Sequence, residues 1–82
     1  MNSHRSLAEL DTALLQAHEK AANHPSEARA LVELYYQAYQ LTLRDEEMAA
    51  YFYLTNAYVY ALDTNHPQAV AIETLLKDAN RL

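Results

Sequence analysis

The sequence predicts an all-α fold of four helices, and two observations carry the prediction. First, the 82-residue chain contains no glycine, whereas about six would be expected at average usage. Asn-Gly and Asp-Gly turns are the strongest short-range hairpin signal, so their absence disfavours an all-β fold. Second, apolar residues recur at spacings of three and four, the period of an amphipathic helix. We therefore expect one helical domain over residues 1–82, with residues 1–5 as a flexible tail.

The first helix is predicted from residue 6 to about residue 22. Ser6 and Glu9 have the spacing of a capping box, in which each side chain bonds the other residue's backbone amide. The apolar residues that follow have a helical period and comprise Leu7, Leu10, Leu14, Ala17 and Ala21. Because proline is tolerated in the first turn of a helix, we expect Pro25 to start the next one.

The second helix is predicted from Pro25 to Leu43, and it carries two apolar faces. One face comprises Leu31, Leu34, Tyr35, Ala38 and Leu41, and the other comprises Val32, Tyr36, Tyr39 and Leu43. A helix that is apolar over most of its circumference packs on more than one neighbour. Asp45 is a suitable N-cap for a following helix, so we predict a break here. A single long helix through residues 42–47 is the alternative.

The third helix is predicted from Glu46 to Leu62 and is apolar or aromatic on all sides. No charged residue lies between Met48 and Leu62, so this helix is expected to lie centrally or to be partly buried by another chain. The fourth helix is predicted from Pro67 to about Arg81. Its apolar set is Ala69, Ile72, Leu75, Leu76, Ala79 and Leu82.

The tripeptide Asn-His-Pro occurs twice, at residues 23–25 and 65–67, each time between two predicted helices. This repetition indicates two tandem antiparallel helical hairpins, at about residues 6–43 and 45–82. They would form either an open array or a small four-helix bundle. The alternative is that each antiparallel helix pair simply uses a turn containing proline.

Residues 49–82 carry a further pattern. Tyr51, Leu54, Thr55 and Tyr58 have the spacing W-x2-L-G-x2-Y, with Thr55 in place of the glycine. The stretch from Leu54 to Tyr58 is close to Leu-Gly-Asn-Ala-Tyr, and Ala69 supplies a small residue for the second helix. On these residues the segment resembles a tetratricopeptide repeat.

The resemblance implies a non-enzymatic adaptor or chaperone-like protein, which holds a segment of its partner in a groove between stacked helices. In that family the first helix of each hairpin lines most of the groove. Carried over to this chain, the groove-facing candidates on the third helix are Asn56 and Tyr60, with Tyr53 as a further one.

Seven tyrosines, all between residues 35 and 60, are the strongest compositional signal. Tyrosine is enriched in interfaces because it combines a large contact area with a polar tip. Tyr35, Tyr51 and Tyr58 share faces with leucines and are predicted to lie in the core. Tyr36, Tyr39, Tyr53 and Tyr60 lie outside those faces and are predicted to contact a partner. Asn56 on the apolar helix either specifies helix register or contacts a ligand. The candidate partner-binding residues are therefore Tyr36, Tyr39, Tyr53, Asn56 and Tyr60.

The residue content also argues against an enzyme. A chain without glycine has no P-loop, no GxGxxG motif and no GxSxG elbow, and a chain without cysteine has no thiolate site. His18 and His24 fall on different helix faces, and His24 and His66 precede prolines in turns, where we expect a cap role or exposure. We predict no catalytic residues, no cofactor and no metal.

The net charge of −5 and the scattered basic residues disfavour binding to nucleic acid or to an anionic membrane. The longest uncharged stretch, residues 48–62, is shorter than the roughly 20 residues of a membrane span, and the first residues lack the apolar region of a signal peptide. Because the absence of cysteine fits a reducing compartment, we expect a cytoplasmic protein. Its expected partner is another protein or a helical or extended peptide segment of one. The alternative is an obligate homodimer that buries the third helix.

Overall fold

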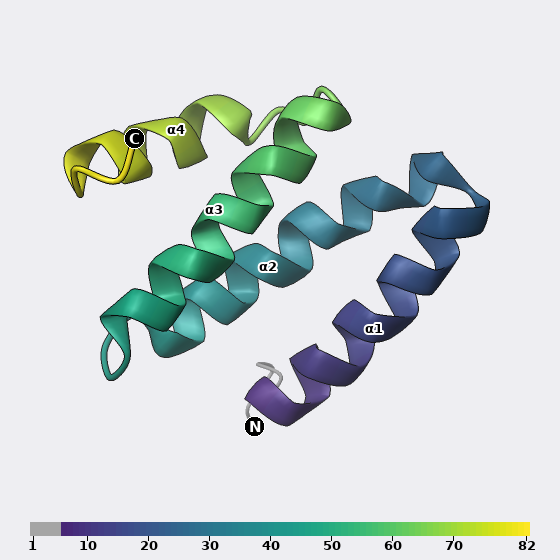
Figure 1. Ribbon diagram of the computed structural model, residues 1–82, viewed down its shortest axis with the longest axis horizontal. Helices are drawn as coiled ribbons and strands as arrows, with labels where there is room; N and C mark the ends of the chain where they lie inside the picture. Colours follow the sequence, from purple (N-terminus) through teal and green to yellow (C-terminus); the bar gives the residue numbers. More distant parts are fainter. Residues whose placement is uncertain (1–5) are drawn as a thin grey trace.

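A computed structural model describes residues 6–82, and within them the chain forms four α-helices and no strand (Figure 1). The helices are α1 (Leu7–Asn23), α2 (Arg29–Thr42), α3 (Glu47–Asp63) and α4 (Ala69–Asp78), and a short 3-10 helix, η1 (Pro25–Ala28), precedes α2. The predicted all-α fold is confirmed. The tail expected at residues 1–5 lies outside the described residues.

The predicted capping box starts α1. The backbone amide of Ser6 donates to Glu9 Oε1 at 2.8 Å, and the amide of Glu9 donates to Ser6 Oγ at 3.2 Å. These two bonds satisfy donors that the first turn of a helix otherwise leaves unpaired. The helix then buries Leu10, Leu14 and Ala17, so both its start and its inner face follow from local sequence.

Three predicted helix starts need correction, and one of them is that of α4, which begins at Ala69 rather than at Pro67. Pro25 begins η1 rather than an α-helix, and α2 begins at Arg29. The amide of Glu27 donates to the carbonyl of His24, three residues back, at 2.8 Å, which is the hydrogen-bond pattern of a 3-10 turn. At the next junction Glu46 is the N-cap of α3, not Asp45, and it makes no side-chain cap bond.

The break between α2 and α3 is confirmed, and the alternative of one long helix is wrong. The hydroxyl of Thr42 donates to the carbonyl of Ala38 at 2.8 Å. This side-chain bond one turn back is of a kind that often bends helices. The carbonyl of Thr42 accepts the amide of Glu46 at 2.8 Å, which closes the turn and lets the chain reverse.

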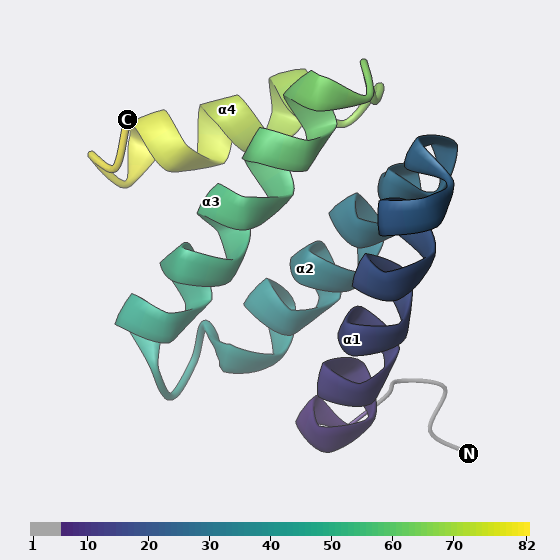
Figure 2. The ribbon, with the colours of Figure 1, turned by 45° about the vertical axis from the view of Figure 1, so that its right-hand side comes forward.

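α2 and α3 run antiparallel and form the most extensive helix pair, while α1 packs on α2 and α4 packs on α3 (Figures 1 and 2). The face of α3 turned toward its neighbours is made of small residues around one leucine: Ala50, Leu54, Ala57 and Ala61, all fully buried. Because alanine side chains are short, the two helix backbones approach closely without glycine. The largest contact therefore joins two helices that the sequence assigns to different hairpins, and the division into two hairpins stays a prediction.

The core has two parts. The larger part lies between α2, α3 and α4, and its buried members include Val32, Leu54, Ile72 and Leu76. The smaller part lies between α1 and α2 and comprises Leu14, Ala17 and Leu31. The third helix is thus central, as predicted, because it contacts both α2 and α4.

Asparagine closes the two helices of the second half. Asn65 and Asn80 have φ angles of 53° and 58°, in the left-handed region. After α3, the amide of His66 donates to the carbonyl of Ala61, and the amide of Asn65 donates to the carbonyl of Leu62. After α4, the amide of Arg81 donates to the carbonyl of Leu76, and the amide of Asn80 donates to the carbonyl of Lys77. Both sets are the paired bonds of a Schellman motif. The motif at Asn80 ends α4 at Asp78, before the predicted Arg81.

The two Asn-His-Pro segments form different turns. Asn23 is the last residue of α1, and His24 is extended and exposed. His66, by contrast, is buried, its Nδ1 accepts the amide of Gln68 at 3.1 Å, and its Nε2 lies 3.8 Å from Glu33 Oε2 on α2. The expected exposure of His24 is confirmed, whereas His66 is buried and accepts a backbone hydrogen bond within its turn, and the N-cap of α4 is Gln68. The tripeptide itself does not mark a structural repeat.

Candidate partner-binding surface

Two of the five predicted partner-binding residues lie on α2, near the C-terminus of the chain. Tyr39 is buried at 5% exposure, and its ring lies 5.6 Å from Tyr36 and 5.7 Å from Tyr51. Tyr36 is half-buried against the larger part of the core. The guanidinium of Arg81 lies 4.8 Å from the centre of the Tyr51 ring, a cation–π distance. This group of rings binds the end of the chain to the helix pair.

Tyr53 and Tyr60 lie in a second group of rings, together with His18 and Tyr35, where α1 meets α2 and α3. His18 Nε2 and the Tyr35 hydroxyl are hydrogen-bonded at 2.8 Å. The rings of Tyr35 and Tyr60 are stacked 6.0 Å apart, and His18 meets Tyr60 edge-on at 5.7 Å. We call these four residues the α1 ring cluster. It holds α1 against the other helices.

Two hydroxyls of the α1 ring cluster, those of Tyr35 and Tyr53, have raised pKa values. Burial raises the pKa of Tyr35, and Tyr60 and Tyr53 raise it further. Burial also raises the pKa of Tyr53, with Asp11 and Glu46 adding to the effect. An activated nucleophile needs a lowered pKa, so these phenols act as hydrogen-bonding groups rather than as phenolates.

Asn56 and Thr55 bond to the helix that carries them. Asn56 Nδ2 donates to the carbonyl of Phe52 at 2.9 Å, and the Thr55 hydroxyl donates to the carbonyl of Tyr51 at 2.8 Å. Both bonds run one turn back along α3. Thr55 is exposed, whereas the corresponding glycine of a tetratricopeptide repeat lies where two helices approach closely. The resemblance to that family therefore stays a prediction.

The structure does not bring the five candidates onto one surface. Tyr36 and Tyr39 pack toward Tyr51, Tyr53 and Tyr60 pack toward α1, and Asn56 is half-buried on α3. Packing between the helices accounts for the position of each tyrosine. A partner-binding role for these five residues remains a prediction.

An exposed apolar surface lies on α3, and sequence reasoning did not single it out. It comprises Met48, Phe52, Val59 and Leu62, exposed at 80%, 64%, 47% and 57% respectively, with Thr55 among them. We call these five residues the α3 outer face. Their spacings of four, three, four and three place them in one row along the helix. The signal was the absence of charge from residue 48 to residue 62. A row of four bulky apolar residues at helical spacing, opposite a row of alanines, would have located the face.

Acidic residues stand at both ends of the α3 outer face. Glu47 precedes Met48, and Asp63 follows Leu62; both are exposed, and α3 contains no basic residue. Asp45 and Glu46, in the preceding turn, are exposed as well. The face is therefore an apolar row of about four helical turns with negative charge at each end.

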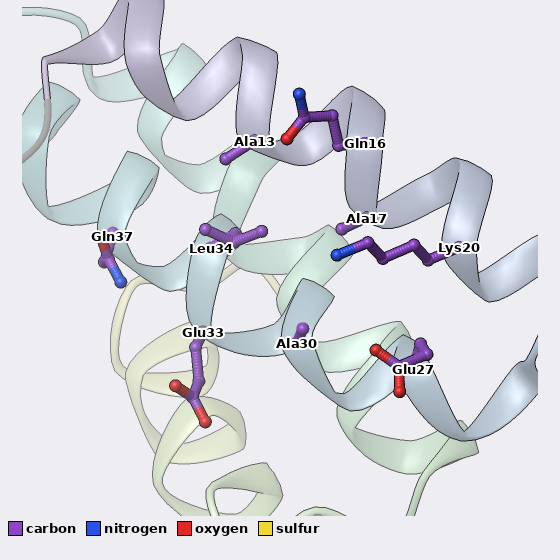
Figure 3. Close-up of a pocket in the computed structure, with 9 residues that line it drawn as sticks. All are labelled: Ala13, Gln16, Ala17, Lys20, Glu27, Ala30, Glu33, Leu34 and Gln37. Carbon is purple, nitrogen blue, oxygen red and sulfur yellow. The ribbon is translucent and has the colours of Figure 1, made fainter.

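An open groove of about 470 Å³ lies between α1 and α2 (Figure 3). Its apolar lining is Ala13, Ala17, Ala30 and Leu34, and its polar lining is Gln16, Lys20, Glu27, Glu33 and Gln37. The polar side chains carry charges of both signs and come from the two sides of the groove, Gln16 and Lys20 from α1 and the others from η1 and α2 (Figure 3). They do not converge on one point, as the polar groups of a small-molecule site do.

Within residues 6–82, no group of three or more metal-ligating side chains is placed to hold a metal ion. In the same part of the chain, none of the helices has the length and apolar character needed to cross a membrane. Comparison of the chain with protein-family models, with curated proteins and with solved structures gave no match.

Proposed function

We propose that the protein is a small non-enzymatic interaction module, adaptor-like or chaperone-like, that binds a helical segment of another protein along the α3 outer face. The observation that carries the proposal is the exposure of Met48, Phe52, Val59 and Leu62 in one row. These side chains present on the order of 400 Å² of apolar surface, within the size range of the largest patch on a typical monomer, which is often functional.

The geometry of the face favours a helix over an extended peptide. An extended segment gains affinity by adding main-chain hydrogen bonds to a sheet edge, and the described residues contain no strand. A helical segment satisfies its own backbone groups and packs its side-chain ridges into the grooves of a second helix. The resemblance of residues 49–82 to a tetratricopeptide repeat supports the same class of function.

A second candidate is a homodimer that covers the same face. The observation in its favour is also the exposed row, because any surface of this kind is stabilised by burial against a second apolar surface. The two candidates differ only in the identity of the occupant, so one experiment separates them.

The test is site-specific photo-cross-linking in cells that produce the full chain. A photoreactive phenylalanine analogue is placed at Phe52, and in a parallel sample at Glu19, an exposed position on α1. We expect a discrete cross-linked band from position 52 that is absent from position 19. Replacing the neighbouring Val59 by Glu should remove that band while leaving the melting temperature unchanged within about 2 °C, because Val59 lies on the surface.

Mass spectrometry of the band identifies the occupant. A second, distinct protein supports the interaction module, whereas a cross-link to a second copy of the chain supports the homodimer. Equal cross-linking from positions 52 and 19, or none from either, contradicts both candidates.

A further inference from the structure

The two ends of the α3 outer face have the same sign of charge, and this specifies its occupant. We propose that the partner is an amphipathic helix whose apolar row has a basic side chain at each end; this rests on the proposed function above. Glu47 and Asp63 lie about 24 Å apart along α3, one residue beyond each end of the apolar row. The partner's basic residues would therefore bracket an apolar row of about four turns.

The neighbouring basic groups do not cancel the negative ends. Arg44 precedes the three acidic residues Asp45, Glu46 and Glu47, which outnumber it. At the other end Arg29 donates to the backbone carbonyl of Thr64 at 2.9 Å. That carbonyl belongs to the negative end of the helix dipole, so Arg29 interacts with the backbone there. Both ends therefore favour a cation.

The same charges disfavour a second copy of the chain. If two α3 helices paired antiparallel, the end that carries Glu47 in one copy would lie beside the end that carries Asp63 in the other. If they paired parallel, like ends would lie side by side, so acidic ends are brought near each other in either orientation. The face also exposes on the order of half of the roughly 800 Å² per partner of a standard interface, so apolar burial would have to overcome this repulsion with a small area.

A partner with basic ends would be attracted to the acidic residues at the two ends of the α3 outer face. Rim charges of opposite sign speed association and suppress wrong partners more than they add affinity. The apolar row would then supply most of the binding free energy, and the charged ends would supply register and selectivity. This division of roles predicts that changing the end charges changes the ranking of partners without abolishing binding.

The test uses three synthetic helical peptides and the full-length protein. Each peptide is alanine-based, with five leucines at spacings of four, three, four and three, and its ends carry either two lysines, two glutamines or two glutamates each. Fluorescence anisotropy at 50 mM salt should rank the peptides lysine, glutamine, glutamate. We expect about 3- to 10-fold between successive members, and smaller ratios at 500 mM salt, where exposed charges are screened.

The charges at the two ends of the α3 outer face are then reversed in the protein. The double variant E47K/D63K should reverse the ranking, so that the glutamate-ended peptide binds tightest. The control E19K/E27K makes the same change in net charge at exposed positions on α1 and η1 and should leave the ranking unchanged. Circular dichroism melting checks that both variants fold. The comparison of peptides on the unchanged protein does not depend on either variant.

The outcomes separate this inference from the proposed function. Equal binding of the three peptides, lost on Phe52→Glu, overturns the basic partner and leaves the interaction module standing. Failure of all three peptides to bind at 200 µM overturns the basic partner. The cross-linking experiment then tests, on its own, whether the protein is an interaction module. A concentration-dependent dimer in light scattering that Phe52→Glu dissociates assigns the face to a second copy. Sedimentation with phosphatidylcholine vesicles assigns it to a lipid surface.

Discussion

At the scale of single residues, this chain uses asparagine where most helical proteins use glycine. The left-handed conformation costs an ordinary L-residue about 1–2 kcal/mol, and asparagine adopts it more readily than other residues because its short polar side chain bonds locally. Asn65 and Asn80 occupy the two left-handed positions of the described residues, and each closes a Schellman motif. The absence of glycine therefore does not force the helices to end without caps.

Asn65 provides the first prediction. Replacing Asn65 by Ala should lower the free energy of unfolding by about 1 kcal/mol, because the left-handed backbone conformation costs alanine more free energy than it costs asparagine. Replacing it by Gly should be neutral or slightly stabilising, since glycine is the preferred residue at this position of the motif. Urea denaturation measures both. Equal stabilities for the two variants would show that the backbone conformation contributes little.

The buried tyrosines give a prediction for alkaline pH. Burial raises the pKa of Tyr35, Tyr39 and Tyr53 above 10.0, with neighbouring groups adding to each shift. Above pH 10 the unfolded chain loses these protons while the folded chain keeps them, so the free energy of unfolding falls as pH rises. The stability contributed by the protonated hydroxyls is complete below pH 10 and is lost as pH passes through the folded pKa values.

Urea denaturation at pH 8, 9.5 and 11 measures this loss. We expect similar stabilities at the two lower pH values and a clear drop at pH 11. Tyr39→Phe, which removes one of the three hydroxyls with a raised pKa, should make the drop smaller. Constant stability up to pH 11 would contradict the shifted pKa values.

At the scale of elements, local signals predicted the start of α1 and the break before α3, whereas they misplaced the starts of α2 and α4 and the end of α4 by two to four residues. They failed altogether where neighbouring helices decide the outcome. The capping box at Ser6 and the break before Glu47 depend on a few adjacent residues, and both were predictable. The outer face of α3 was not, because a helix that is apolar all round carries no amphipathic pattern to separate inside from outside. Tyr39 was assigned to a partner on its separation from the leucines, yet Tyr36 and Tyr51 enclose it within the chain.

The two faces of α3 give a prediction at this scale. Leu54 is fully buried between helices, so Leu54→Ala should cost about 2–5 kcal/mol through the cavity it leaves. Phe52 is a larger side chain two residues away, but it is mostly exposed, so Phe52→Ala should change the free energy of unfolding by less than about 0.5 kcal/mol. Chemical denaturation of both variants measures the difference. A cost above about 2 kcal/mol for Phe52→Ala would mean that its ring is buried in solution.

At the scale of the whole molecule, thickness explains why an apolar face is left uncovered. The molecule measures 34 × 31 × 21 Å, and its smallest dimension corresponds to about two helix diameters. In a structure of two layers each helix has at least one side toward solvent. α3 packs against α2 and α4 (Figure 2). Its outer face nevertheless remains exposed. Four helices of this length cannot bury an element that is apolar on every side.

The unequal division of the core predicts that α1 opens before the rest of the molecule. The buried cluster that α1 shares with α2 comprises Leu14, Ala17 and Leu31, whereas the larger part of the core joins three helices. Regions with few buried contacts unfold locally at lower free energy than the core. In native-state hydrogen exchange, the amides of residues 11–20 should therefore exchange through an opening that costs less than global unfolding, and those of residues 52–61 only through global unfolding.

Tyr35→Phe, which removes the bond to His18, should lower the opening free energy of α1 by about 1 kcal/mol. Tyr36→Phe is the matched control, because its ring lies in the other group, and it should leave α1 unaffected. Equal protection of residues 11–20 and 52–61 would show instead that the four helices unfold as one unit.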